Sequence, residues 1–282
     1  MKAERLVLVA ALAAASCGTP LMKLPSGPGA AVPKADAMAA LAEATRACGS
    51  VRTLTADIAV SGSAGGHRLR GRLSAGVAAP ASARLEAMAP FGPPLFVFVA
   101  NDDDATLLLP RDARVLAHGR PDAVLDAVAG VPLGAADLEE TLTGCVAARD
   151  TANAQTRQFG DVWQVVSSAA SDQLYLHRAS AGAPWILTAR VRRADGGRAW
   201  RVEYRDHANG LPRTVRVISV DAADDDAARG RAFDLQLVLS QVETNVPLDA
   251  EAFTIQIPKD AAPISLEELR RSGPLGPKSH ED

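Results

Sequence analysis

Short segments in which apolar and polar residues alternate follow one another along most of this chain, and they constrain its fold more than any other feature. In LTADIAV, for example, Leu54, Ala56, Ile58 and Val60 occupy every second position. Alternation with a period of two is typical of strands that have one buried and one solvated face. About a dozen such segments follow one another at hairpin spacing, which predicts local connections and an antiparallel sheet. A sheet of that size must curl.

Three segments have helical periodicity instead. The first begins near Asp36, a suitable N-cap, and ends before Gly49, a suitable C-terminal stop. Two more lie in mid-chain, in RPDAVLDAVAG and VPLGAADLEETLTG, and each ends at a glycine. The expected fold class is therefore α+β. A large curled antiparallel sheet forms an incomplete, half-open barrel, and an N-terminal helix and a mid-chain helix pair cover an apolar cavity.

The first residues resemble a secretion signal. Lys2 and Arg5 precede an apolar run from Leu6 to Ala15, and small residues lead to Cys17. This order is typical of a signal peptide, and the run is shorter than the roughly twenty residues that a spanning helix needs. The residues before Cys17 resemble a bacterial lipobox. Residues 1–16 are therefore predicted to be a lipoprotein signal peptide and Cys17 to be lipidated, and an ordinary signal peptide cut nearby is the alternative.

The remaining chain divides by composition. Residues 17–35 are rich in Pro and Gly and are expected to form a flexible tether behind the lipidated cysteine. Residues 36–258 contain the periodic segments and are expected to form one domain, and residues 259–282 a C-terminal tail. The net charge is −3, and basic residues are interspersed with acidic ones. This distribution gives no indication of a nucleic-acid partner.

No motif in the sequence predicts catalysis, a metal site or a cofactor. There is no G-x-S-x-G, phosphate-binding loop or G-x-G-x-x-G, and the histidines are far apart. Cys48 and Cys145 can pair in an oxidising compartment, and two buried free thiols are the alternative. Arg68, Arg70 and Arg72 share the polar face of one predicted strand. They form either a solvated edge or a contact for phospholipid head groups or an acidic carrier protein.

The stretch MAPFGPPLFVF, residues 88–98, joins two predicted strands through a turn without a polar side chain. This is unusual because turns normally face water. Phe91 at the tip either folds back onto the core or stays exposed, whereas the contiguous apolar residues after the turn are predicted to be core and cavity lining. The residues predicted to line the cavity are Ile58, Val60, Leu69, Leu73, Leu85, Leu95 and Leu107.

The chain resembles the bacterial lipoprotein-localisation family of LolA and LolB over roughly residues 36–258. The resemblance rests on the order of helix, six strands, helix pair and further strands, and on three segments. These segments are RLEAMAPFGPPLFVFV, GVPLGAADLEETLTG and WRVEYRDHANGLPRTVRV. The resemblance is greatest to LolB, an outer-membrane lipoprotein, although the ending NVPLDAEAFTIQIP is more similar to LolA. The chain departs from the family at residues 145–160, in the acidic loop DAADDDAARG and in the tail after Pro258.

The resemblance implies an apolar cavity that takes the acyl chains of lipoproteins, and an apolar turn, here Phe91, that promotes their insertion into the membrane. It implies a non-enzymatic, lipid-anchored protein of the outer membrane that faces the periplasm. Its partners would be acylated lipoproteins or other lipid, the inner leaflet of the outer membrane and a periplasmic carrier protein. The alternative is a structural or regulatory envelope lipoprotein that binds a glycolipid, an export component or a partner protein.

Overall fold

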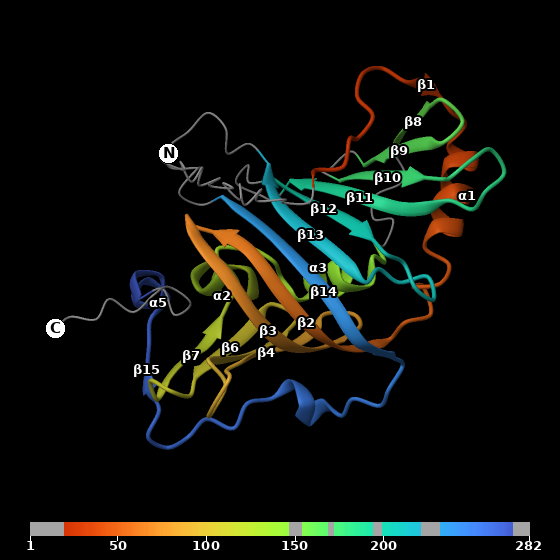
Figure 1. Cartoon of the computed structure of the whole chain (residues 1–282). Helices are drawn as coiled ribbons and strands as arrows, with labels where there is room; N and C mark the ends of the chain where they lie inside the picture. Colours follow the sequence, from red (N-terminus) through yellow and green to blue (C-terminus); the bar gives the residue numbers. More distant parts are fainter. Residues whose placement is uncertain (1–19, 147–153, 169–171, 194–198, 221–231, 273–282) are drawn as a thin grey trace, which may run out of the picture.

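One large sheet dominates the computed structural model, which describes residues 20–146, 154–168, 172–193, 199–220 and 232–272. It is 15-stranded, in the order β1-β8-β9-β10-β11-β12-β13-β14-β2-β3-β4-β5-β6-β7-β15 (Figure 1). Neighbouring strands pair antiparallel, except that β15 runs parallel to β7. The pairing of β14 with β2 joins the two halves of the sheet, so the connections are not all local.

The strands before the helix pair are β2 (Thr53–Ala64), β3 (His67–Ala78), β4 (Ser82–Met88), β5 (Phe96–Asn101), β6 (Asp104–Leu109) and β7 (Arg114–Gly119). Those after it are β8 (Gln155–Phe159), β9 (Trp163–Ser167), β10 (Gln173–His177), β11 (Ile186–Arg193), β12 (Ala199–Arg205), β13 (Thr214–Val220) and β14 (Phe233–Thr244). The two edges are the short strands β1 (Ala30–Ala31) and β15 (Ala262–Pro263). The helices are α1 (Lys34–Ala44), α2 (Pro121–Ala129), α3 (Ala135–Thr143) and α5 (Leu266–Ser272), with a 3-10 turn η2 (Ala250–Phe253).

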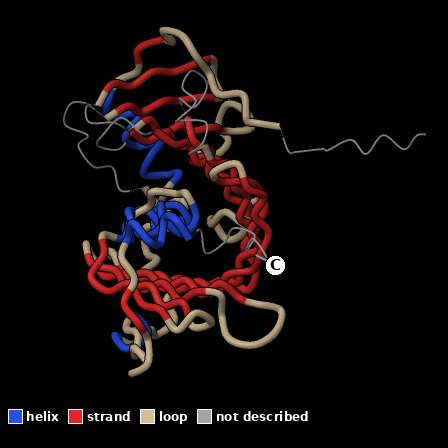
Figure 2. The backbone as a smooth tube through the Cα atoms, turned by 90° about the vertical axis from the view of Figure 1, so that its left-hand side faces the viewer, coloured by secondary structure: helices blue, strands red, loops and turns tan. Residues whose placement is uncertain are grey.

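The sheet bends into an open C, and α2 and α3 lie inside the bend (Figure 2). Helix α3 packs against β3 and β4, and α2 packs against β6. Apolar side chains of both helices, among them Val124 and Leu142, join those of the inner sheet face in one hydrophobic cluster. The predicted fold class is confirmed, since the sheet curls around a helix pair without closing into a barrel.

Helix α1 lies against β8 to β11 (Figure 1). The helix begins at Lys34, two residues before the predicted N-cap Asp36. Pro33, whose backbone is extended, is the N-cap instead. Asp36 instead lies in the first turn, where its charge suits the positive end of the helix dipole. The helix ends at Ala44 rather than near Gly49. Cys48, which follows in a turn, forms a disulfide with Cys145, 97 residues away in sequence.

The predicted tether is wrong for residues 20–33, which cross the outer face of the sheet and then pair with β8 through β1. The Met22 N–H donates to Glu203 Oε1 at 3.0 Å, and Arg205 Nη2 donates to the Pro20 carbonyl at 2.9 Å. Met22 and Leu24 also pack on an apolar cluster around Tyr175. A Pro- and Gly-rich composition disfavours regular structure, but it does not prevent such contacts.

The predicted C-terminal boundary at residue 258 is also wrong. The chain continues along the edge of β7 as β15 and then forms α5, which packs against α2. Leu269 of α5 is fully buried, and Arg114 Nη2 lies 2.7 Å from Glu268 Oε1. In addition, residues 253–257, FTIQI, form no strand, because η2 occupies the start of this segment. The fold therefore includes residues 259–272.

We expect Leu269→Ala to lower the free energy of unfolding by about 2–5 kcal/mol, the range for truncating a fully buried leucine. Arg270→Ala, at the exposed neighbouring position, is the control and should change it by less than about 0.5 kcal/mol. Urea unfolding of the two variants provides the measurement. A free tail would make both variants indistinguishable from the parent.

Candidate functional site

The inner face of the sheet forms an apolar wall opposite α2 and α3. Six of the seven predicted lining residues lie on it: Ile58, Val60, Leu69, Leu73, Leu85 and Leu107. Their exposure divides them into two groups. Ile58 and Leu107 are at most 1% exposed, and Leu85 is also buried, so this part of the wall is filled by neighbouring side chains. Val60, Leu69 and Leu73 are only half-buried.

The half-buried residues are neighbours across three strands. Leu237 of β14 pairs with Val60 of β2, which in turn pairs with Gly71 of β3. Leu69 and Leu73 flank Gly71 on the same face, because side chains two residues apart in a strand point the same way. A Cβ atom added to Gly71 would have no atom within 4 Å. We call Val60, Leu69, Leu73 and Leu237 the inner strip, an apolar part of the wall that the helices leave uncovered.

Leu95 does not line the hollow, so this prediction is wrong. It precedes β5 on the side opposite Phe96, whose ring joins the core, and it is 37% exposed. The contiguous apolar residues Leu95 to Phe98 have no period, so the sequence could not assign them to a face. The outward residue Val97 is instead buried by Phe253 of η2.

The Phe91 side chain is 89% exposed, which contradicts the alternative that it folds back onto the core. Its turn is held in place from a neighbouring loop. Arg111 donates from Nη2 to the Phe91 carbonyl at 2.6 Å and from Nε to the Pro93 carbonyl at 3.3 Å. Gly92 has a φ of +79°, a conformation that a side chain would disfavour. The turn therefore presents an apolar ring to the solvent, and Arg111 holds its backbone.

An open groove of about 1020 Å³ lies over the ends of β2 and β3 and extends to the Phe91 turn. Most of its lining side chains belong to the outer face of the sheet, and Val60 and Leu69 of the inner strip also border it. The outer-face side chains come from Ala59, Ser61, Ser63, Arg68, Arg70, Arg72, Met88, Leu95 and Val238. We call this feature the outer groove.

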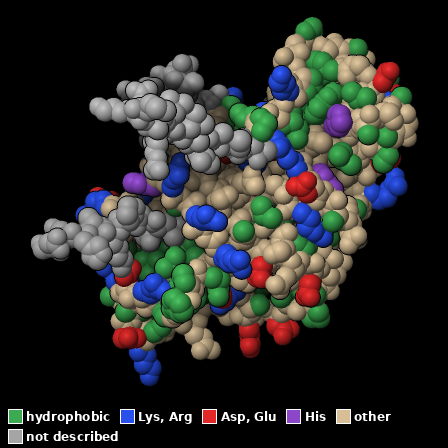
Figure 3. Space-filling model, in the orientation of Figure 1, with side chains coloured by type: hydrophobic (Ala, Val, Ile, Leu, Met, Phe, Trp, Pro, Cys, Tyr) green, Lys and Arg blue, Asp and Glu red, His purple; other side chains and the backbone are tan. Residues whose placement is uncertain are grey.

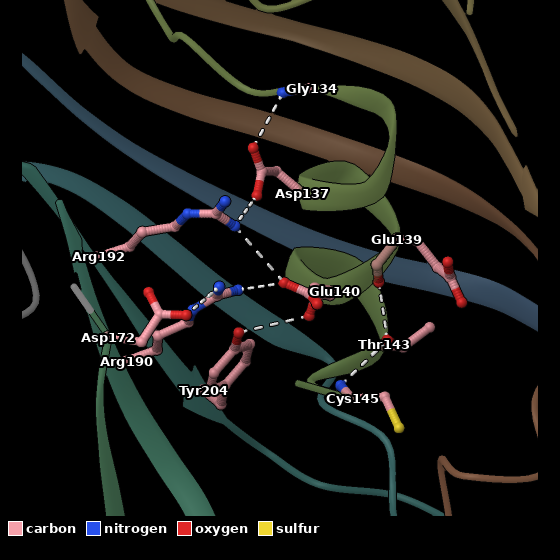
Figure 4. Close-up of polar contacts among 10 residues, drawn as sticks. All are labelled: Gly134, Asp137, Glu139, Glu140, Thr143, Cys145, Asp172, Arg190, Arg192 and Tyr204. Atoms are coloured by element: carbon pink, nitrogen blue, oxygen red, sulfur yellow. Dashed lines mark hydrogen bonds and ion pairs between the residues drawn. The ribbon is translucent and has the colours of Figure 1, made fainter. Parts of the chain in front are cut away.

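A buried ionic cluster fastens α3 to the opposite wall of the hollow (Figure 4). Glu140, which is 4% exposed, accepts a hydrogen bond from Arg190 of β11. Arg190 also donates to Asp172 at 2.8 Å. One turn away along α3, Asp137 accepts from Arg192 and from the Gly134 N–H at the helix start. These contacts fix both the position and the rotation of α3.

Arg190, at the centre of the ionic cluster, stays charged over the physiological range of pH. Burial alone would lower the pKa of Arg190, but the carboxylates of Glu140 and Asp172 outweigh that effect and raise it. The pKa of Tyr204 is raised as well, chiefly by complete burial. Its hydroxyl donates to the Glu140 carbonyl at 3.4 Å and stays protonated. Neither Arg190 nor Tyr204 is therefore poised to exchange a proton near neutral pH.

The sequence prediction missed this cluster, although a signal for it was present. Arg190 and Arg192 are two residues apart in the strand ILTARVRR, and Asp137 and Glu140 are three apart in the helix AADLEETLT. Both spacings place the pair on one face. Only the fold shows that these two faces meet.

A smaller pocket of about 440 Å³ lies where α2 and α3 begin, and its lining is mostly polar, including Arg120, Asp122 and Asp137. Among the described residues, no group of three or more His, Cys, Asp or Glu side chains could hold a metal ion. No helix in that part of the chain is both long and apolar enough to span a bilayer. Cys17, the signal peptide and the acidic loop after Val220 lie outside the described residues.

Comparisons with known proteins support the fold. No model of a protein family matches the sequence, and no curated protein is similar to it. The structure is similar to that of a LolA superfamily protein from Nitrosomonas europaea, with 12% identity and a TM-score of 0.50, over 78% of this chain and 97% of the other. A DUF1329 family protein from Desulfovibrio piger matches with 11% identity and a TM-score of 0.50, over 77% and 96% of the two chains. The predicted LolA-like fold is thus confirmed.

We expect Glu140→Ala to lower the free energy of unfolding by about 3–5 kcal/mol, because it leaves Arg190 buried with one of its two carboxylate partners missing. Glu267→Ala, which removes an exposed glutamate from α5, is the control and should cost less than about 0.5 kcal/mol. Urea unfolding at neutral pH measures both. Equal effects in the two variants would mean that the ionic cluster does not hold α3.

Proposed function

We propose that this protein is a lipid-anchored carrier of the bacterial envelope, which accepts the acyl chains of lipoproteins on the inner strip and helps to insert them into the outer membrane. The observation that carries the proposal is the exposure of the inner strip. Val60, Leu69, Leu73 and Leu237 continue the apolar wall beyond the part that α2 and α3 cover. Burial of acyl chains on such a surface is favourable by about 0.8 kcal/mol for each methylene group.

The arrangement of the helices supports a binding site at this place. Helix α3 is held by buried ion pairs on the side of β11, so it cannot move over the inner strip without breaking them. The end of α2 approaches the β2–β3 turn, where a Cβ on Gly130 would lie 3.4 Å from that of Ala64. An acyl chain on the inner strip would therefore contact helices that are already fixed on either side.

The membrane steps depend on two residues. Lipidation of Cys17 would anchor the chain, since two or more acyl chains give stable membrane attachment. Phe91 would insert into the interface, where burial of one aromatic side chain gains about 1.5–3 kcal/mol. That gain is too small to anchor a protein, but it is enough to favour contact of the turn with the bilayer. Its exposure, the contact of Arg111 with its carbonyl and the resemblance to LolB support this role.

The proposal includes no covalent chemistry, because transfer of an acyl chain between two apolar environments requires none. The alternative, an envelope lipoprotein that acts through protein or glycolipid contacts, is favoured by one observation. The wall around Ile58, Leu85 and Leu107 is filled by neighbouring side chains rather than open. A measurement of lipid binding distinguishes the two functions.

We expect Gly71→Trp to weaken binding of a fluorescent fatty acid about tenfold or more, because the new ring would cover the inner strip. The free energy of unfolding should change by less than about 1 kcal/mol, since the site has open space for the ring. Ser74→Trp, at an exposed position on the other face of the same strand, is the control. It should change neither fatty-acid binding nor the free energy of unfolding. A parent protein that binds no fatty acid would contradict the carrier function and favour the alternative.

We expect Phe91→Glu to slow the transfer of a labelled lipoprotein into liposomes without affecting fatty-acid binding. The unfolding free energy should change by less than about 0.5 kcal/mol, as at other exposed sites. Ile257→Glu is the control, because it places the same charge at another exposed apolar residue. Transfer at the parental rate by the Phe91 variant would exclude a role for the turn in delivery.

A further inference from the structure

The outer groove combines a row of basic side chains with a group of exposed apolar ones. Its middle consists of Arg68, Arg70 and Arg72, which follow one another at every second position of β3, about 7 Å apart. Exposed apolar side chains flank this row. Met88 and Leu95 lie on the β4 side and Val238 lies on β14, beyond β2, and they are 48%, 37% and 40% exposed. Figure 3 shows basic side chains spaced over this part of the face, with hydrophobic side chains nearby.

Two of the acidic groups beside this arginine row are paired with other arginines, and a third, the exposed Asp57 of β2, lies diagonally from Arg72. Asp234, across β2 from the row, accepts two hydrogen bonds from Arg216, at 2.7 and 2.6 Å. Glu86 of β4 is paired with Arg84 of its own strand at 2.6 Å. Among the described residues, no ion pair involves a member of the row. Its guanidinium groups are therefore available to an anionic ligand.

The two kinds of side chain in the outer groove match the two parts of a phospholipid. Guanidinium groups bind phosphate through charge-assisted hydrogen bonds and are preferred at such contacts. Exposed Met and Leu side chains next to them gain free energy at the boundary between head groups and acyl chains. The Phe91 turn begins directly after Met88 and ends before Leu95, so these two apolar residues continue into the exposed ring.

We propose that the outer groove is the surface on which this domain rests on the membrane, with Arg68, Arg70 and Arg72 binding the phosphates of phospholipid head groups. This inference deepens the proposed function and depends on it for the role of Phe91. Since the row and the inner strip alternate along β3, docking through the row leaves the opposite face of that strand free to hold an acyl chain.

The test compares vesicle binding by chains that all carry Cys17→Ser, so that no acyl anchor contributes. One variant carries Arg68→Gln, Arg70→Gln and Arg72→Gln. The control carries Arg46→Gln, Arg52→Gln and Lys259→Gln, which removes the same charge from exposed positions outside the groove. Partition is measured on phosphatidylcholine vesicles with and without phosphatidylglycerol, and thermal melts check that each variant is folded.

The parent and the control should bind the anionic vesicles more tightly than the neutral ones, and salt should weaken this preference. The row variant should bind the anionic vesicles about 100-fold more weakly than the parent, since each basic residue near such a surface contributes roughly a factor of five. A parent that does not distinguish the two vesicles would overturn the proposal. Equal losses of binding to anionic vesicles in the row variant and the control would also overturn the proposal.

Fatty-acid binding by the same variants separates this inference from the proposed function. The row variant should bind fatty acid like the parent, because its substitutions lie on the other face of β3. If the parent binds fatty acid but the row variant binds anionic vesicles as tightly as the parent does, only the proposal of a membrane-docking surface is wrong. If the parent binds no fatty acid, the carrier function is wrong, whatever the result with vesicles.

Discussion

The inner face of the sheet is apolar, and because the sheet curls without closing, other parts of the chain have to cover it. The covering consists of α2 and α3, which are short and make few contacts with each other. Each is held from outside the pair. Helix α5 packs on α2, and Arg190 and Arg192 bind α3. The disulfide between Cys48 and Cys145 links the chain after α3 to the turn after α1.

The position of α3 determines which part of the wall stays uncovered. A buried charge without a partner is strongly unfavourable, so Glu140 has to remain next to Arg190 on the side of β11. Helix α3 packs against β3 and β4, in which Val77 and Leu85 are buried, whereas the stretch around Gly71 stays open. A polar interaction on one side of the hollow thus leaves part of the apolar wall uncovered on the other.

Strand β3 carries both proposed functional surfaces, because its residues alternate between the two faces of the sheet. Leu69, Gly71 and Leu73 face the hollow, and the arginines between them face outward. One strand can therefore contact an acyl chain on one side and head groups on the other. The Phe91 turn lies at the end of the neighbouring hairpin and continues the outer surface.

The sequence by itself determined the curled antiparallel sheet, the helix pair and the inward direction of residues such as Ile58 and Leu73, since alternation and helical spacing are local properties. It could not assign Leu95 to a face, because a continuous apolar run has no period. Only the tertiary structure decided that Pro20 to Leu24 bind the outer face near Glu203, that Leu269 is core, and that Glu140 meets Arg190. These contacts join residues far apart in the chain, and their free energy depends on the surfaces that the fold brings together rather than on neighbouring residues.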